Sequence, residues 1–277
     1  MLSHMDTRRH PSCSPLVLLA CCAWLLAGCG TTGLGAPDSE PAGGAPPRAV
    51  QDEGRDPLKG FNRAMYTFNE KLDKYVMKPL AKGYRAVVPT VARRGVANFF
   101  SNLSEPITIV NDLLQGKLKR TFADLGRFVV NTTIGIFGIF DPATSIGLEK
   151  HDEDFGQTLA VWGVDEGPYL VLPFFGPSNL RDGVGLVADY EAYPPTHMEE
   201  TSTRDKLILV EAVSTRDRLL DATDILEQAA GEDPYIFVRE AYRQRRRNQV
   251  YDGNPPQEAP DSLLFEEDPP AKPPVKP

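Results

Sequence analysis

Every cysteine of this chain lies within its first 29 residues, so no disulfide can stabilise the fold of the residues that follow. The four are Cys13, Cys21, Cys22 and Cys29. Arg8 and Arg9 precede an uncharged, mostly apolar run from Leu16 to Leu26. That run is too short for a membrane-spanning helix, which needs about 20 residues, and is typical of an export signal. The exported chain must therefore fold by burying side chains alone.

The residues around the fourth cysteine resemble a bacterial lipobox. Leu26-Ala27-Gly28-Cys29 places small residues before the cysteine that receives the lipid. The resemblance implies cleavage after Gly28 and acylation of Cys29. Acyl chains contribute about 0.8 kcal/mol per buried methylene, enough together for stable membrane attachment. The alternative is a chance cysteine in an ordinary signal peptide.

Composition predicts one domain between two tails. We expect a signal peptide over 1–28, a Pro/Gly-rich disordered linker over 29–56, a single domain over 57–250, and a disordered Pro-rich acidic tail over 251–277. The linker and the tail hold few apolar side chains to bury. The net charge of −8 argues against a nucleic-acid binder, which would carry a basic surface.

Charge is distributed unevenly along the expected domain. Residues 59–127 hold 13 Lys and Arg against 5 Asp and Glu, whereas residues 128–238 hold 6 against 20. Residues 239–250 are basic again, with 5 against 1. A basic first section suits anionic headgroups, and an acidic middle section suits a basic partner protein. The alternative is that these charges only solvate helix faces.

The domain is predicted to be mainly α-helical. Asp56-Pro57 should open a first helix with Asp56 as its N-cap, and its apolar stripe recurs at helical spacing. Proline should break the chain at Pro79 and Pro89, giving short helices over Thr90–Ser101 and Pro106–Gln115. The stripe of the first helix consists of Phe61, Met65, Phe68, Leu72 and Tyr75.

A basic amphipathic helix follows. Its apolar residues are Leu118, Phe122, Leu125 and Val129, and it carries Lys117, Lys119, Arg120 and Arg127. We expect the apolar face to pack a core. The alternative is that the helix lies in a membrane interface.

Two later segments are harder to interpret. The uncharged run from Ile134 to Phe140 is compatible with a buried strand, a Gly-kinked helix end or an apolar hairpin dipping into lipid. Local rules predict a β-hairpin of TLAVWGV and YLVL around Asp165-Glu166-Gly167, although Pro168, Pro173 and Pro177 weaken a central strand.

The last third of the chain reads as helices. We expect one helix over Thr203–Ala229, with Leu209, Val213 and Leu220 on one side. Another should begin at Asp233-Pro234, place Tyr235, Val238 and Tyr242 on one face, and end in the basic residues Arg243 to Arg247.

The sequence offers no catalytic constellation. After Cys29 the only histidines are His151 and His197. His151-Asp152-Glu153-Asp154 lacks further N or S ligands for a metal and is expected to be a solvated acidic loop. Ser178 lies in Gly176-Pro177-Ser178-Asn179-Leu180, which is not a nucleophile elbow, and is better interpreted as a helix N-cap. No phosphate-binding glycine loop is present. We therefore expect neither an enzyme nor a cofactor.

Several runs together resemble the VacJ/MlaA family of outer-membrane lipoproteins. They occur in family order across residues 56–247: DPLKGFNR from Asp56, YxFN from Tyr66, NLxEP from Asn102, FGQTL from Phe155, WGVxxGPY from Trp162, LPFxGPSxxRD from Leu172 and DPY from Asp233. The resemblance implies a mainly α, ring-shaped bundle of amphipathic helices lying in one membrane leaflet around a central amphipathic channel. It also suggests that Thr158–Leu172 is helical or irregular, against the hairpin prediction.

Family membership implies a function in phospholipid transport. The family removes mislocalised phospholipid from the outer leaflet of the outer membrane and passes it to a periplasmic lipid-carrier protein. A trimeric porin is the second implied partner. We expect a lipid-anchored protein on the periplasmic, inner-leaflet face of the outer membrane. The alternatives are an envelope-tethering lipoprotein that moves no lipid, and a lipid hydrolase, against which the missing Ser/His constellation speaks.

Two Gly/Pro-interrupted apolar segments are candidates for shaping the channel. Irregular backbone is acceptable at membrane depth only where it lines a cavity or packs on protein. Tight packing against neighbouring helices is the equally weighted alternative. The candidate residues are Gly135, Phe137, Gly138, Phe140, Tyr169, Leu172, Pro173, Phe174 and Gly176.

Overall fold

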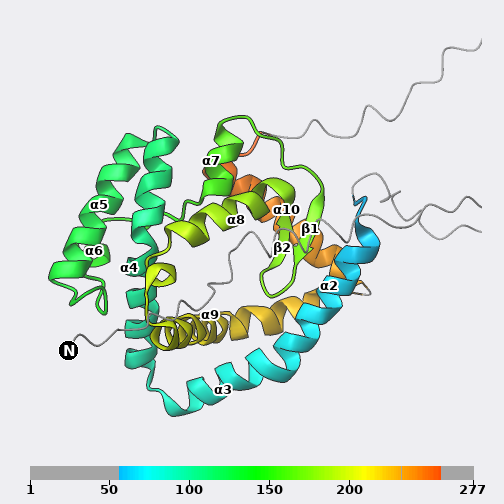
Figure 1. The fold of residues 1–277 in the computed structure, drawn as a ribbon, viewed down its shortest axis with the longest axis horizontal. Coiled ribbons are helices and arrows are strands. Elements are labelled where there is room, and N and C mark those ends of the chain that lie inside the picture. Colours follow the sequence, from blue (N-terminus) through cyan, green and yellow to red (C-terminus); the bar gives the residue numbers. More distant parts are fainter. Residues whose placement is uncertain (1–55, 232, 257–277) are drawn as a thin grey trace, which may run out of the picture. The chain divides into compact units, whose positions relative to one another are not determined.

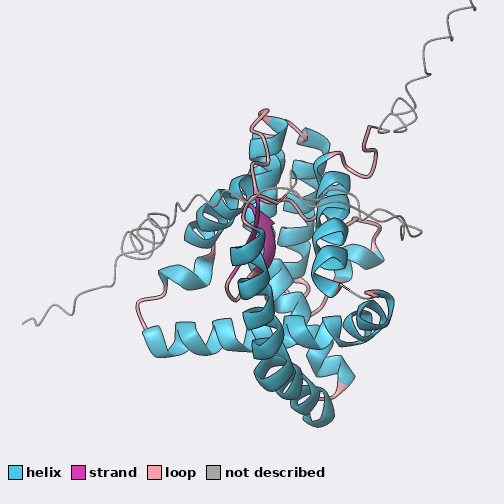
Figure 2. Cartoon of the chain, turned by 90° about the vertical axis from the view of Figure 1, so that its right-hand side faces the viewer, coloured by secondary structure: helices cyan, strands magenta, loops and turns pink. Residues whose placement is uncertain are grey.

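The computed structural model describes residues 56–231 and 233–256. The expected signal peptide, the linker up to residue 55, Cys29 and residues 257–277 lie outside the described residues. The described chain is mainly helical, as expected, with one pair of short strands (Figures 1 and 2). Its elements are α2 (Lys59–Leu72), η2 (Asp73–Met77), α3 (Lys78–Val87), α4 (Thr90–Leu114), α5 (Leu118–Thr133), α6 (Pro142–Ser145), α7 (Phe155–Val161), β1 (Tyr169–Leu172), β2 (Gly176–Asn179), α8 (Leu180–Ala192), η3 (Pro194–His197), α9 (Thr201–Ala229) and α10 (Pro234–Val250).

The first helix begins later than predicted, and Asp56 does not cap it. Helix α2 starts at Lys59, and its N-cap residue Leu58 makes no side-chain capping bond. Asp56 is instead buried, where its carboxylate accepts hydrogen bonds from Asn62 Nδ2 at 2.8 Å and from the Tyr235 hydroxyl. The Asp56 carboxylate therefore joins α2 to α10 and does not cap the start of a helix.

Pro79 does not break the chain as predicted. α2 continues through the π-helical turn η2 directly into α3, and Pro79 lies in the first turn of α3. A proline inside an α-helix clashes with the carbonyl four residues earlier, here that of Tyr75, and a π-turn widens the helix at this point. Pro89 does separate helices: Val88 is extended and Pro89 is the N-cap residue of α4.

The two short helices predicted around Pro106 are one helix. α4 runs for 25 residues with Pro106 inside it. An interior proline costs about 3 kcal/mol. That cost is offset because α4 packs along α5, and the two helices lie side by side (Figure 1). Tertiary packing therefore overrides the local break signal.

A β-hairpin forms, but with a different partner strand from the one predicted. YLVL is β1 and pairs antiparallel with β2, with Leu170 opposite Ser178 and Val171 opposite Pro177. The first predicted strand is instead helix α7. The family resemblance was thus right for Thr158–Val161 and wrong for Tyr169–Leu172.

Helix starts in the second half follow capping chemistry. Asn179, not Ser178, caps α8 by accepting a hydrogen bond from the Asp182 backbone N–H at 2.7 Å. Asp233 caps α10 as predicted. In α9, Leu220 is buried but Leu209 is 54% exposed, so the predicted apolar side of this helix packs only in part.

A small apolar core holds the hairpin against two helices. Tyr169, Val171 and Tyr235 are buried together, and Met65, Tyr66, Ile236 and Tyr242 pack around them. Tyr66 and Tyr169 both meet the ring of Tyr235 edge-on, at 5.8 and 6.3 Å between ring centroids. The core therefore ties β1 to α2 and α10.

Candidate functional site

Helix α5 presents its apolar face outward and its polar face inward. Its buried residues are Thr121, Asp124, Arg127 and Asn131. The predicted core stripe is exposed, by 56% at Leu118, 70% at Phe122, 43% at Leu125 and 51% at Val129. The prediction of core packing for this stripe was wrong. The exposed face matches the alternative, a helix with its apolar side toward a membrane interface.

The same inversion recurs on α2 and α4. On α2, Phe61 and Phe68 of the apolar stripe are exposed by 46% and 41%, while the one buried residue is Asn62. Tyr75, just beyond α2, is 70% exposed. On α4 the buried residues are mostly polar: Gly95, Phe100, Asn102, Glu105, Thr108, Asn111 and Asp112. Contiguous apolar surface of this kind marks an interaction with lipid or protein.

Arg127 organises the polar interior between α5 and the following turn. Its guanidinium donates to both carboxylate oxygens of Asp141 at 3.1 and 3.2 Å, and lies 3.6 Å from Glu105. Asn131 donates to the same Asp141 carboxylate at 3.0 Å. Burial raises the pKa of Glu105 to about 7. These groups hold the turn after α5 against α4.

A second polar cluster joins α4, α5 and the loop before α7. Asp112 and Asp124 are both fully buried, and His151 Nδ1 lies 3.0 Å from Asp124. Burial first, then the neighbouring Asp124 carboxyl, raise the pKa of Asp112 to about 8. No donor reaches either Asp112 oxygen, whereas a protonated Asp112 can donate to the neighbouring Asp124 carboxylate, so the protonated form fits this site best.

The His151–Asp154 segment is not the solvated loop expected from the sequence. Only Asp152 is exposed. Glu153 is buried, and its carboxylate receives Lys117 Nζ at 2.9 Å and Arg120 Nη1 at 3.1 Å. A local sequence reading cannot see these cations because they come from the start of α5.

Replacing Asp112 with asparagine should make stability less dependent on pH. The carboxyl pKa is raised on folding, so its stabilising contribution is fully present below about pH 4 and is lost as pH rises through about 8. Near pH 5 the unfolded carboxyl is already ionised while the folded one is not, so the wild type has begun to lose this contribution. Between pH 5 and pH 9 the stability difference should shift in favour of Asp112→Asn by about 1–3 kcal/mol. Denaturant unfolding at both pH values measures this.

Asp152→Asn is the matched control, because that side chain is 77% exposed and its replacement should leave the pH dependence unchanged. Equal stability of the Asp112→Asn variant and the wild type at both pH values would contradict a neutral Asp112.

A third polar network fastens α10 to α7 and α8. Arg246 donates to both oxygens of Asp154, at 2.6 and 2.7 Å, and to Asp182 at 2.9 Å. Burial alone would raise the pKa of Asp154, but the Arg246 hydrogen bonds hold it below its usual value. Asp182 also accepts the Tyr242 hydroxyl at 2.6 Å. Within the basic end of α10, Arg246 is therefore a buried structural residue, whereas Arg245 is exposed.

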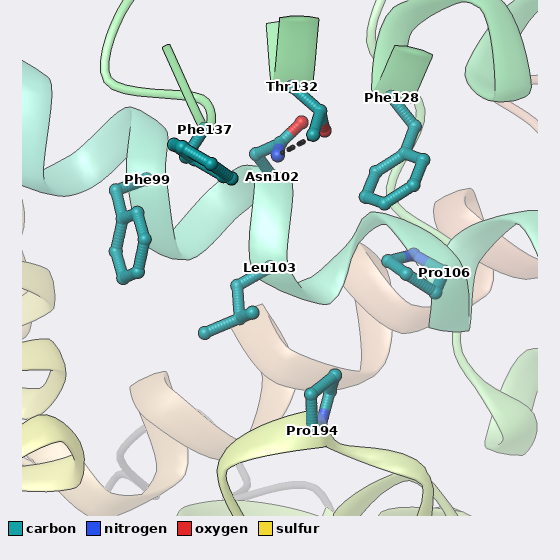
Figure 3. A pocket seen from close by; sticks show the side chains of 8 residues that line it. All are labelled: Phe99, Asn102, Leu103, Pro106, Phe128, Thr132, Phe137 and Pro194. Carbon is teal, nitrogen blue, oxygen red and sulfur yellow. Dashed lines mark hydrogen bonds between the residues drawn. The ribbon is translucent and has the colours of Figure 1, made fainter. Parts of the chain in front are cut away.

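An apolar cavity of about 220 Å³ opens beside the α4–α5 pair (Figure 3). Its polar groups are Asn102 and Thr132, and Asn102 Nδ2 donates to Thr132 Oγ1 at 3.0 Å. Pockets that enclose a whole small ligand are larger, roughly 300–1,000 Å³, so this one suits the end of an apolar chain. Its walls are Phe99, Asn102, Leu103 and Pro106 from α4, Phe128 and Thr132 from α5, Phe137 from the following turn, and Pro194 from η3.

The first candidate channel segment adjoins this cavity. Phe137 lines it, with a ring that is 71% exposed, and Phe140 is 55% exposed. Gly138 packs so closely on Asn102 that a Cβ would lie 2.3 Å from Asn102 Cβ. A Cβ on Gly135 would lie 2.4 Å from the Phe140 carbonyl oxygen. The glycines allow the tight turn that presents the two phenylalanines.

The second candidate segment divides between core and surface. Tyr169 is buried in the apolar core, and Leu172 is half-buried. Pro173 and Phe174 lie at the exposed hairpin tip, and Phe174 meets Phe68 edge-on at 5.4 Å. Gly176, with φ of +85°, closes the tip. Phe174 therefore packs against α2, and it is not among the residues that line the cavity at Phe137.

Sequence reasoning missed the polar residues that fill the interior. Asn102, Glu105 and Asp112 on α4, and Asp124 and Asn131 on α5, recur three or seven residues apart opposite an apolar stripe. That polar periodicity was available in the sequence, but in most proteins it marks the solvated face.

Within residues 56–231 and 233–256, no group of three or more His, Cys, Asp or Glu side chains is arranged to hold a metal ion. No helix in the described part of the chain combines the length and the apolar character needed to cross a membrane.

The fold and the site define a class of protein: a helical body with a polar interior, an apolar outer surface and an apolar cavity, suited to contact with lipid. The family model described as "MlaA lipoprotein" matches residues 54–249. The chain belongs to this MlaA lipoprotein family.

Named relatives agree with this assignment. The chain is 40% identical over 225 residues to the "Intermembrane phospholipid transport system lipoprotein MlaA" of Escherichia coli K12, covering 79% of this chain and 88% of the relative. The Haemophilus influenzae protein of the same name is 37% identical over 224 residues, covering 78% and 88%. A solved structure described as "Structural basis for maintenance of bacterial outer membrane lipid asymmetry" matches with a TM-score of 0.62 and 40% identity, covering 72% of this chain and 99% of that chain.

Proposed function

We propose that this chain removes mislocalised phospholipid from the outer leaflet of the outer membrane, as the lipoprotein of an intermembrane phospholipid transport system. The observation that carries the proposal is the inverted polarity of α5 and its neighbours. Exposed Phe122 and buried Asp124, two residues apart, place an apolar surface outside and ionisable groups inside. The relatives that share this chain's sequence are named for phospholipid transport.

The lipid path combines an apolar wall with polar groups. A phospholipid needs apolar contacts for its tails and polar contacts for its head, and its transfer makes or breaks no covalent bond, so the function requires no enzyme chemistry. The cavity lined by Phe137 supplies apolar contacts for a tail, and Asn102 and Thr132, which also line it, supply polar contacts for a head. The helices form a ring in one leaflet, and the segment 135–140 and the hairpin tip 173–176 shape its central amphipathic channel.

The anchor and the partners complete the proposal. After removal of residues 1–28, acylated Cys29 holds the chain on the periplasmic face of the outer membrane, with 29–55 as linker, 56–250 as the transport domain and 251–277 as a tail. A trimeric porin holds the domain, and a periplasmic carrier receives the lipid.

Replacing Phe137 or Phe174 with aspartate should block lipid passage without preventing expression. Both rings are 71% exposed, so folding loses little, but a charge on an apolar lipid path costs about 2.5–3.5 kcal/mol. We expect the outer-leaflet phospholipid of both strains to approach that of a deletion strain. Phe137→Leu and Phe174→Leu keep the apolar contacts and serve as controls. Unchanged lipid asymmetry in both aspartate variants contradicts the proposed lining.

Bound lipid separates transport from the alternative, an envelope tether that moves no lipid. The full-length protein, purified in detergent and extracted, should carry phospholipid detectable by mass spectrometry, and the Phe137→Asp variant should carry less. If the wild-type protein and the Phe137→Asp variant both carried only background phospholipid, the result would favour the tether.

A further inference from the structure

The outer edge of strand β1 is closed by two asparagine side chains of helix α2. Asn62 Nδ2 donates to the Tyr169 carbonyl at 2.9 Å, and Asn62 Oδ1 accepts the Val171 N–H at 2.9 Å. Asn69 repeats the arrangement: its Nδ2 donates to the Leu172 carbonyl at 2.9 Å, and its Oδ1 accepts the Phe174 N–H at 2.8 Å. Asn62 thus makes the two bonds that a neighbouring strand would make, and Asn69 makes the corresponding two bonds where β1 ends and the turn begins.

The spacing of the two asparagines matches the strand. Seven residues of α-helix rise about 10.5 Å, and three residues of strand advance about 10 Å. Asn69 therefore lies about three residues further along the chain than Asn62, where Leu172 ends β1 and Phe174 belongs to the hairpin turn. The arrangement also explains why β2 tolerates Pro177, which has no N–H. Val171 directs its N–H to Asn62 and away from β2, so Val171 and Pro177 form a non-hydrogen-bonded pair that needs no N–H from Pro177.

The two asparagines differ in their surroundings. Asn62 is fully buried and also bonds to Asp56, so it belongs to the core. Asn69 is only half-buried and holds the hairpin tip. There Phe174 adopts a φ of +69°, a strained conformation for a bulky residue that persists only where its surroundings enforce it. The Asn69 bond and the Phe68 ring are the contacts that enforce it.

We propose that Asn69 is a positioning residue that holds the exposed Phe174-Phe175 tip of the hairpin where it contacts lipid. The inference rests on the proposed function and adds to it the group that sets one of its lipid contacts. Because a two-stranded hairpin alone is marginally stable, the tip without Asn69 moves even though its root stays docked through Asn62.

Asn69→Ala in the full-length protein tests this. Thr67→Ala is the matched control, since Thr67 lies on the same helix and its hydroxyl bonds only to the Arg63 carbonyl. Asn69→Asp is the conservative variant, because it keeps the acceptor for the Phe174 N–H and loses the donor to Leu172. Hydrogen exchange is measured on the purified variants, with peptides 172–176 reporting on the hairpin tip and 59–66 on the start of α2. Outer-leaflet phospholipid is measured in cells that carry the same variants.

We expect Asn69→Ala to raise exchange at 172–176 by about 10-fold or more, with exchange at 59–66 and the Tm near wild type. Outer-leaflet phospholipid should rise toward the deletion level, with Asn69→Asp between the two and Thr67→Ala at wild type. Unchanged exchange at 172–176, or increased exchange with wild-type asymmetry, overturns the positioning role. If the deletion strain itself shows no excess phospholipid, the proposed function fails, while exchange at 172–176 still decides whether Asn69 holds the tip.

Discussion

Replacing Arg246 with alanine should destabilise the folded protein by about 3–5 kcal/mol, which is a large part of the stability of an ordinary domain. The guanidinium is buried and is the cation shared by Asp154 and Asp182. Removing the guanidinium takes this cation away from the carboxylates of Asp154 and Asp182, and Asp154 is the residue that caps α7. We therefore expect α7, α8 and α10 to loosen together. Denaturant unfolding of the purified protein measures the change.

The neighbouring Arg245 provides the control for this prediction. Its side chain is exposed and lies one residue away on the same helix. Arg245→Ala removes the same charge and the same number of atoms, so its stability should stay within about 0.5 kcal/mol of wild type. Equal losses in the two variants would mean that the buried Arg246 network does not hold these helices.

Replacing Phe122 with aspartate should abolish most of the membrane affinity of the domain without unfolding it. The ring is 70% exposed at the centre of the α5 apolar face. A carboxylate in hydrocarbon costs about 2.5–3.5 kcal/mol, so binding to phospholipid vesicles should weaken roughly 100-fold. The measurement uses the Cys29→Ala chain, so that no acyl chain masks the effect.

Phe122→Leu is the control and should bind vesicles nearly as well as the parent chain. Two results would contradict a lipid-facing α5. One is equal vesicle binding by the aspartate variant and its parent. The other is unfolding of the aspartate variant, which would place Phe122 in a core after all.

The sequence predicts the helices well but not which of their faces points inward. Periodicity finds both stripes of α5, the apolar one through Phe122 and the polar one through Asp124. The usual rule assigns the apolar stripe to the interior because the usual surroundings are water. Where the surroundings are lipid that rule inverts, and nothing in a single helix reveals it.

The errors in the fold arise where distant residues override local signals. Pro106 lies inside α4 because α5 packs along it, and β1 pairs with β2 while Asn62 and Asn69 of α2 occupy its other edge. Asp56 has the sequence context of an N-cap, but in the structure its carboxylate accepts a hydrogen bond from the Tyr235 hydroxyl. β2 follows β1 closely, but Asn62 lies 107 residues from Tyr169 and Tyr235 lies 179 residues from Asp56, so local propensity alone could not find these two partners.

The candidate site was predicted in part for the same reason. The Gly-interrupted run left a buried strand, a Gly-kinked helix end and an apolar hairpin open, and the structure shows a turn after α5 that places Phe137 at a cavity. The opposite walls, Phe99 and Phe128, come from α4 and α5, whose pairing the sequence does not specify. Tyr169 shares the same type of apolar run but is buried in the core.

Outer-leaflet phospholipid is the measurement that tests the central claim most directly. It would be quantified in a deletion strain, in the same strain carrying the intact gene, and in one carrying Cys29→Ala. The account predicts excess surface phospholipid in the deletion strain, restoration by the intact gene, and excess again with Cys29→Ala if the anchor is required. A deletion strain whose outer leaflet is indistinguishable from wild type would contradict lipid removal and leave the tether as the better explanation.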